Sequence, residues 1–248
     1  RQYIPGDSYD EIHWKATAKR RHPITKIFQV ERTQEVYVII DASRLSARCS
    51  HSPISGEDDS NTILERYITA ALVIGLVAEK QGDLFGVLTF SDRVQRFLRA
   101  KNGKAHYNAC RDALYTLEPQ IVTPDFHDLC AFIRLRLRRR ALLAFLTDLS
   151  DPVVAESFAR NMDLICRHHL VIVNMLNPSG ARPLFSDTNV ASIHDLYENL
   201  AGHMLWHDLR ELEKILHRRG IRFSLLDHEK LSTQVVSQYM SVKQRQLL

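Results

Sequence analysis

Short, nearly continuous apolar runs recur along the chain from residue 35 onward, and longer stretches with helical spacing separate them. Runs that are apolar on both faces are typical of strands in the middle of a sheet that is covered on both sides. The predicted strands occupy residues 35–41, 84–90, 141–148, 169–176 and 221–227. Their alternation with helices predicts βα units around a mostly parallel sheet.

Polar and apolar residues alternate over residues 93–100, directly after a Ser-Asp pair, which predicts a hairpin partner of the second strand. Helices are predicted over residues 62–81, 104–117, 126–139, 152–167, 193–219 and 229–246. Asn61 or Thr62 is expected to cap the first of them, Gly82 to end it, and Gly202 to break the fifth. The predicted fold is α/β and doubly wound (Rossmann-like), with one antiparallel edge strand.

The first 34 residues differ from the rest, because they contain a Pro-Gly turn and one Trp among many basic side chains. Residues 1–34 are therefore predicted to form an N-terminal arm packed against a sheet domain of residues 35–248. The basic residues are Arg1, Lys15, Lys19, Arg20, Arg21, Lys26 and Arg32. They fit a solvated face or a contact with acidic lipid or a partner, and both interpretations stay open.

Composition sets limits on the whole chain. Its 248 residues are 45% hydrophobic, which suffices for a sizeable core, and the net charge of +4 is too small to require a nucleic-acid partner. The four cysteines have no Cys-x-x-Cys pair, which favours reduced thiols of the cytosol over disulfides or zinc. The chain has no membrane-spanning apolar run and does not begin with Met, so we expect it to be a piece of a longer protein.

Acidic and hydroxyl side chains follow two of the predicted strands. The first strand ends in Asp41 with Ser43 two residues on, and the third leads into Thr147, Asp148, Ser150 and Asp151. Thr123 lies in a loop just before a predicted helix. Because ligands collect at the carboxyl ends of parallel strands, these oxygens are expected to meet there. Hard oxygen ligands of this kind suit Mg²⁺ or Mn²⁺ better than zinc.

The same three segments resemble the metal-ion-dependent adhesion site of von Willebrand factor type A domains. The family pattern Asp-x-Ser-x-Ser, a Thr from a second loop and an Asp from a third match Asp41, Ser43, Thr123 and Asp148. Leu45 departs from the pattern, since it stands where the second serine would be, although Ser46 could replace that hydroxyl after a local shift. The alternative is a degenerate site in which Asp41 and Asp148 cap helix N-termini and hydrogen-bond the loops.

The N-terminal stretch "RQYIPGDSYDEIHWKATAKR", followed by "VERTQEVYVIIDAS", closely resembles the bacterial family known as domain of unknown function 58 (DUF58). The resemblance implies a non-enzymatic module that binds a protein partner, such as a MoxR-type AAA+ ATPase, in protein assembly or maturation. It also implies a parent anchored upstream in the membrane, with this part on the cytoplasmic face of the bacterial inner membrane and the basic arm beside the inner leaflet. The residues expected to bind the partner are Asp41, Ser43, Ser46, Asp148 and Ser150.

Two other classes of function stay open. A metal-dependent hydrolase would need a general base, for which His51 and His127 are the candidates in the matching loops. The run "RLRLRRR" at residues 134–140 raises nucleic-acid binding, although basic residues at a helix end also complement its dipole.

Two further motifs are weak. His203 and His207 have the spacing of a zinc pair but are expected to be ordinary surface or partly buried residues, because Met204 stands where a zinc protease has Glu. The Gly-Lys pair at Gly103 lacks the other residues of a phosphate-binding loop. The polar segment 47–61, with Glu57, Asp58 and Asp59, is predicted to be a loop beside the metal site.

Overall fold

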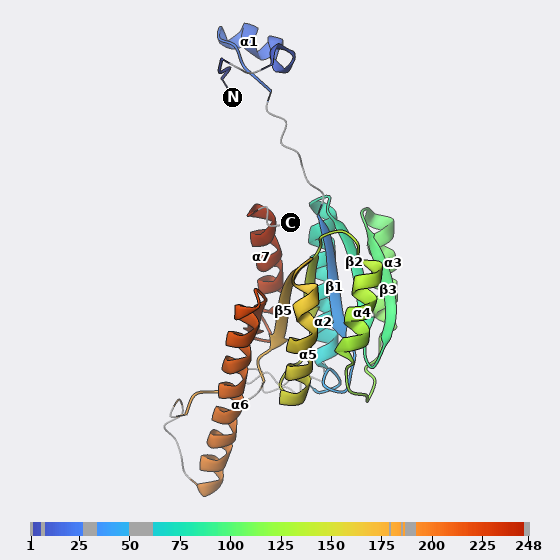
Figure 1. The fold of residues 1–248 in the computed structure, drawn as a ribbon, viewed down its shortest axis with the longest axis vertical. Coiled ribbons are helices and arrows are strands. Elements are labelled where there is room, and N and C mark those ends of the chain that lie inside the picture. Colours follow the sequence, from blue (N-terminus) through green and yellow to red (C-terminus); the bar gives the residue numbers. More distant parts are fainter. Residues whose placement is uncertain are drawn as a thin grey trace. The chain divides into compact units, whose positions relative to one another are not determined.

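The protein is described by a computed structural model that covers residues 2–5, 8–26, 34–49, 62–178, 180–184, 186 and 192–245. The chain divides into two compact units, Arg1–Thr33 and Gln34–Leu248 (Figure 1). The smaller unit contains η1 (Tyr9–Glu11) and α1 (Trp14–Arg20). Antiparallel bridges from Gln2 to Ile24 and from Ile12 to Thr25 close it. That this arm packs against the sheet domain stays a prediction.

The larger unit is built on a six-stranded sheet. Its strands are β1 (Glu35–Asp41), β2 (Leu84–Phe90), β3 (Val94–Lys101), β4 (Leu142–Leu146), β5 (Leu170–Leu176) and β6 (Arg222–Leu226). Their order is β3-β2-β1-β4-β5-β6, and every neighbouring pair is parallel except β2 and β3. The predicted mostly parallel sheet and its antiparallel edge strand are therefore confirmed. We call the edge where the five parallel strands end the carboxyl edge, and the opposite one the amino edge.

Helices cover both faces of the sheet (Figure 1). One face carries α4 (Phe126–Arg136), α5 (Pro152–Ile165) and α6 (Ile193–Arg218), and the other carries α2 (Ile63–Lys80), α3 (Lys104–Tyr115) and α7 (Leu231–Gln244). Successive side chains of β1 point to opposite faces of the sheet. Tyr37 and Ile39 pack in the core beneath α4, α5 and α6, while Val38 and Ile40 pack in the core beneath α2, α3 and α7. This explains why the strand sequences are apolar on both faces.

The predicted break in the fifth helix is wrong, because α6 runs without interruption through Gly202. The glycine has a packing role instead: a Cβ at this position would collide with the carbonyl oxygen of Gly180. Other boundary predictions are confirmed. Thr62 caps α2 in a capping box with Glu65, and Gly82 follows the helix at a φ of +73°.

A second buried carboxylate lies at the amino edge. Asp83, only 2% exposed, accepts hydrogen bonds from the Gln34 backbone N–H at 3.2 Å, from the Tyr239 hydroxyl and from Lys243 Nζ at 2.9 Å. These contacts join α7 to the loop before β2. The burial of Asp83 is thus compensated by a cation and by two hydrogen-bond donors.

Two general features were also expected from the sequence. All four cysteines are free thiols. Within the described ranges, no helix has both the length and the apolar character that crossing a membrane requires.

Candidate site at the carboxyl edge

Three loops meet where β1 and β4 end. The loop after β1 is tied to the 117–125 loop by two backbone hydrogen bonds, from Gln120 N to Ala42 O at 2.7 Å and from Arg44 N to Val122 O at 3.1 Å. The loop after β4 joins them through the Thr147 hydroxyl. As predicted, residues far apart in the sequence converge at the carboxyl edge.

Asp41 ends β1 and is completely buried. Its Oδ1 accepts from the Ser43 backbone N–H at 2.9 Å, and its Oδ2 accepts from Thr147 Oγ1 at 2.6 Å. Burial raises the pKa of Asp41 to about 6, although the hydrogen bonds from Thr147 and Ser43 oppose this rise. The carboxylate thus has neutral partners and no bonded cation among the described residues.

Asp148 lies beside it in the loop after β4 and is 5% exposed. Its Oδ1 accepts from the Ser150 backbone N–H at 2.8 Å, and Arg48 Nη1 is 3.9 Å from its Oδ2. Burial raises the pKa of Asp148 as well, and its charge adds to the rise in the pKa of Asp41. Two neighbouring buried carboxylates create a negative potential that favours a bound cation.

Ser43 gives the most direct sign of an incomplete site. Its side chain is fully buried and close enough to Asp41 to lower the pKa of that carboxyl, yet its Oγ forms no hydrogen bond of acceptable geometry with the described residues. Other buried polar atoms without such a partner lie elsewhere in the larger unit, including Thr89 Oγ1 on β2 and both amide atoms of Asn174 on β5. Buried polar atoms normally find partners, so the Ser43 hydroxyl beside two carboxylates calls for a ligand, an ion or water.

The other predicted site residues take different positions. Ser46 is buried, and its Oγ donates to the backbone oxygen of Asp41 at 2.5 Å. Leu45 is 2% exposed. Thr123 is exposed on its loop, and no contact brings it to either carboxylate among the described residues. Ser150 is half-buried. The structure therefore brings Asp41, Ser43 and Asp148 together, and Thr123 is exposed on the adjoining loop.

The idea that Asp41 and Asp148 cap helices needs correction. The caps are their neighbours: Asp151 accepts from Val153 N at 3.0 Å at the start of α5, and Asp125 accepts from His127 N at 2.8 Å at the start of α4. Both carboxylates of the site accept instead from the backbone N–H two residues ahead, which shapes their loops. The hydrogen-bonding part of that alternative is confirmed, and its capping part is wrong.

The accessible part of the site, which we call the rim, consists of Arg44, Ile121, Asp151 and Val153. Sequence reasoning identified Asp151 and missed the other three. Arg44 Nη2 pairs with Asp151 Oδ2 at 2.9 Å, which joins the first loop to the third. Ile121 is 89% exposed and precedes Val122, whose carbonyl accepts from Arg44 N. Val153 is 76% exposed and donates its backbone N–H to Asp151. Two features of the sequence could have indicated these apolar residues. Ile121 is a large apolar residue in a loop outside any predicted strand, and Val153 directly follows the Asp-Pro start of a predicted helix.

Other candidates lie outside this site. His203 Nδ1 accepts from the Leu184 backbone N–H at 3.0 Å and His207 is exposed, so the prediction of ordinary surface or partly buried histidines is confirmed. Arg138, Arg139 and Arg140 are exposed between α4 and β4. His127 is exposed on α4, whereas His51 and the acidic residues 57–59 lie outside the described residues.

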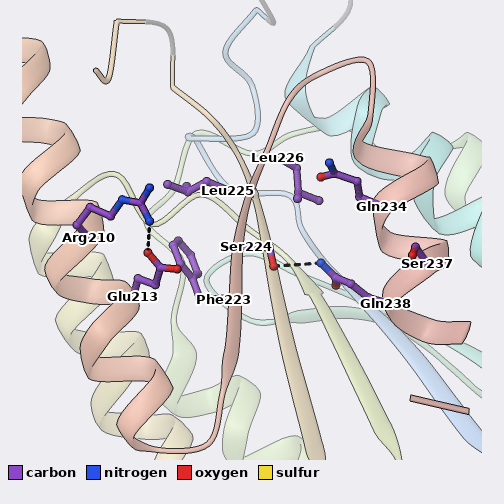
Figure 2. Close-up of a pocket in the computed structure, with 9 residues that line it drawn as sticks. All are labelled: Arg210, Glu213, Phe223, Ser224, Leu225, Leu226, Gln234, Ser237 and Gln238. Carbon is purple, nitrogen blue, oxygen red and sulfur yellow. Dashed lines mark hydrogen bonds and ion pairs between the residues drawn. The ribbon is translucent and has the colours of Figure 1, made fainter. Parts of the chain in front are cut away.

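A cavity of about 430 Å³ lies between α6, β6 and α7 (Figure 2). Gln238 Nε2 donates to Ser224 Oγ at 3.1 Å on one side of it, and Arg210 pairs with Glu213 at 2.7 Å on the other. Its lining includes none of the predicted site residues. The cavity is therefore separate from the carboxylate site.

Among solved structures, the PilB minor pilin from Streptococcus sanguinis is similar with a TM-score of 0.56 and 11% identity, over 90% of this chain and 64% of the pilin. BatB from Bacteroides thetaiotaomicron has a TM-score of 0.49 and 14% identity, over 86% of this chain and 99% of its own. The SpRpn10 VWA domain has a TM-score of 0.48 and 10% identity, over 82% and 94%. No curated protein matches the chain in sequence.

The fold is α/β, with a mostly parallel sheet and one antiparallel edge strand, and it is similar to the fold of the pilin. The model of the family "Protein of unknown function DUF58" matches residues 1–185. The chain belongs to this family, as the resemblance of its first residues predicts.

Proposed function

We propose that this protein is a non-enzymatic protein-binding module whose rim contacts a partner, and that the partner is a MoxR-type AAA+ ATPase. The observation that carries the proposal is the exposure of Ile121 and Val153 beside the Arg44–Asp151 pair, over a buried acidic site. Exposed apolar side chains surrounded by charged ones are typical of protein interfaces. Asp41, Ser43 and Ser46 are buried, so they would act through the rim or through an ion.

The buried oxygens are consistent with a divalent cation. Asp41, Ser43 and Asp148 would hold Mg²⁺ or Mn²⁺, since two carboxylates and a hydroxyl without a partner form a hard oxygen set. Leu45 supplies no ligand, and Thr123 would join only by turning inward from its exposed position. When bound, the ion would supply positive charge between the carboxylates and an exchangeable coordination position for a partner's oxygen.

Membership in the family supports the proposed setting. We propose that the parent protein is anchored in the bacterial inner membrane, that this part faces the cytoplasm, and that it acts in protein assembly or maturation. In that setting the basic residues of the arm would lie near the anionic inner leaflet.

Binding of a purified MoxR-type ATPase, measured by biolayer interferometry, tests the proposal. The double variant Ile121→Ala/Val153→Ala should weaken binding at least tenfold, which corresponds to about 1.4 kcal/mol. Leu135→Ala is the matched control, because Leu135 is also 76% exposed but lies at the end of α4 near the amino edge. Equal binding by the wild type and the double variant would show that the rim is not the interface.

A further inference from the structure

Helix α6 has two apolar faces. Its C-terminal half buries Leu209, Leu212 and Leu216 against the sheet. Its N-terminal half exposes five large apolar side chains, each between 45% and 74% exposed. We call them the α6 stripe: Ile193, Leu196, Tyr197, Leu200 and Met204. Their spacing of three and four residues places them on one side of the helix, away from the buried face.

The N-terminal half of α6 (orange) extends beyond the ends of α5 and of the sheet (Figure 1). The α6 stripe therefore cannot pack on the core that holds the other half of the helix. Isolated exposed apolar residues are ordinary, but a continuous row on a projecting helix indicates a binding surface.

The stripe continues into a groove between α5 and α6 with a volume of about 340 Å³. Ile215, 42% exposed, lines this groove on the same side of α6 as the stripe. Leu149 and Ala155 also line it, and Ser150 and Pro152 at the start of α5 line it close to the carboxylate site. From Ile193 to Ile215 the surface follows the helix for ~33 Å, which suits a partner helix of about 20 residues.

The charges around this surface favour a basic occupant. Asp208 and Glu211 lie between the stripe and Ile215 with side chains 57% and 61% exposed. Arg160 and Arg219 also line the groove, but Arg160 pairs with Glu156 at 2.6 Å and Arg219 pairs with Asp163 at 3.1 Å. Among the described residues of the lining, Asp208 and Glu211 are therefore the acidic side chains that form no ion pair with Lys or Arg. From residue 193 to residue 209, α6 contains no Lys or Arg. Helices that lie on anionic membranes carry such residues on their polar face, so the composition favours a protein over a lipid surface.

We propose that the α6 stripe and the α5–α6 groove bind a basic amphipathic helix of a partner protein. The apolar face of that helix lies along the stripe and in the groove, and its Lys or Arg residues pair with Asp208 and Glu211. This inference rests on the proposed function, because it names the kind of segment that holds the partner at a second surface beside the rim.

Two synthetic 20-residue amphipathic helices, one of Leu and Lys and one of Leu and Glu, serve as probes in fluorescence anisotropy. The Leu/Lys peptide should bind the wild type at least tenfold more tightly than the Leu/Glu peptide. The variant Leu196→Glu/Leu200→Glu should lose at least tenfold in affinity for it, and the milder Leu200→Ala about threefold. Asp208→Asn/Glu211→Gln should lose about threefold to tenfold, and more at low salt than at high salt.

Leu135→Glu is the matched control and should bind the Leu/Lys peptide like the wild type. Equal binding of the two peptides, or unchanged binding by both the Glu and the Ala variants of the stripe, would overturn the proposal. Dimerisation that Leu200→Glu abolishes would assign the stripe to a second copy of this chain. Binding to vesicles of anionic lipid that Leu200→Glu abolishes would assign it to a membrane.

The two proposals fail separately. Ile121→Ala/Val153→Ala should leave peptide binding unchanged, because neither residue lines the groove. If the peptide test fails while this variant still loses the ATPase, only the inference about α6 is wrong. If the peptide binds as expected and the ATPase binds the rim variant normally, only the assignment of the rim as the interface is wrong.

Discussion

Asp41 and Asp83 are both buried carboxylates, but they lie at opposite edges of the same sheet and have different surroundings. Asp83 at the amino edge accepts from Lys243, Tyr239 and a backbone N–H. Among the described residues, Asp41 at the carboxyl edge accepts from a hydroxyl and a backbone N–H, and the charge of Asp148 raises its pKa.

The difference separates a group that stabilises the fold from one kept for a ligand. A buried carboxylate paired with a cation has its desolvation cost offset. Asp41 has no such cation among the residues that the structure describes, so its ionised form weakens the native state. A protein keeps such a cost where function needs the charge, and the Ser43 hydroxyl without a partner lies in the same place.

The largest expected effect is at the amino edge. Asp83→Ala should lower the free energy of unfolding by about 3 kcal/mol, because it leaves Lys243 and the Tyr239 hydroxyl without their partner in a largely buried site. Urea denaturation followed by circular dichroism measures this. The control Asp112→Ala removes an exposed carboxylate and should change the value by less than about 0.5 kcal/mol. A change of less than about 0.5 kcal/mol for Asp83→Ala would mean that Asp83 does not stabilise the fold, and its contrast with Asp41 would be lost.

The next effect has the opposite sign and depends on pH. An unfolded Asp ionises near 3.8 and Asp41 in the folded protein near 6, so the folded state retains a proton between these values that the unfolded state has lost. The contribution of Asp41 to stability should therefore fall as the pH rises from about 4 to 6, and stay low above that. In chelator, Asp41→Asn should lack this fall and be more stable at pH 7 by about 3 kcal/mol.

If the free energy of unfolding of Asp41→Asn falls in parallel with that of the wild type between pH 4 and 6, then Asp41 does not destabilise the fold, and its contrast with Asp83 is contradicted. Urea denaturation at a series of pH values gives both curves. Asp83→Asn, measured beside them, should be less stable than the wild type at pH 7.

A smaller effect concerns the rim. Arg44→Ala should cost no more than about 0.5 kcal/mol, since its pair with Asp151 is partly exposed and screened by solvent. Thermal unfolding at low and high salt measures it, with Arg111→Ala as the exposed control. A loss above about 2 kcal/mol would make the rim a structural element.

The smallest effect on stability is expected for Ser43→Ala. The hydroxyl has no hydrogen-bond partner among the described residues, so its loss in chelator should change the free energy of unfolding by less than about 0.5 kcal/mol. The variant should still lose much of any stabilisation by Mn²⁺. A large loss of stability without metal would mean that the hydroxyl has a structural partner.

Much of the fold was predictable because local patterns determine it. The doubly apolar strands, the alternation in β3 and the cap at Thr62 follow from spacing and residue type. The break at Gly202 was wrong because the close approach of Gly180 depends on tertiary packing. The Asp83 cluster joins residues more than 150 positions apart, which periodicity cannot reveal.

The candidate site was predictable in its residue types but less so in its geometry. Strand ends located Asp41, Ser43 and Asp148, whereas the outward position of Thr123 depends on the loop conformation. The pairing of Arg44 with Asp151 needs two loops in space. The α6 stripe did leave a signal in the sequence, because apolar residues at 193, 196, 197 and 200 repeat with helical spacing on a different side from Leu209 and Leu212.

The most direct test compares urea unfolding of the wild type and Asp41→Asn at pH 7, each in chelator and in millimolar Mn²⁺. The account predicts that the variant is more stable in chelator and that only the wild type gains in Mn²⁺, by about 2.7 kcal/mol at 100 times the dissociation constant. A variant that is less stable under both conditions would contradict it, because Asp41 would then stabilise the fold as Asp83 does.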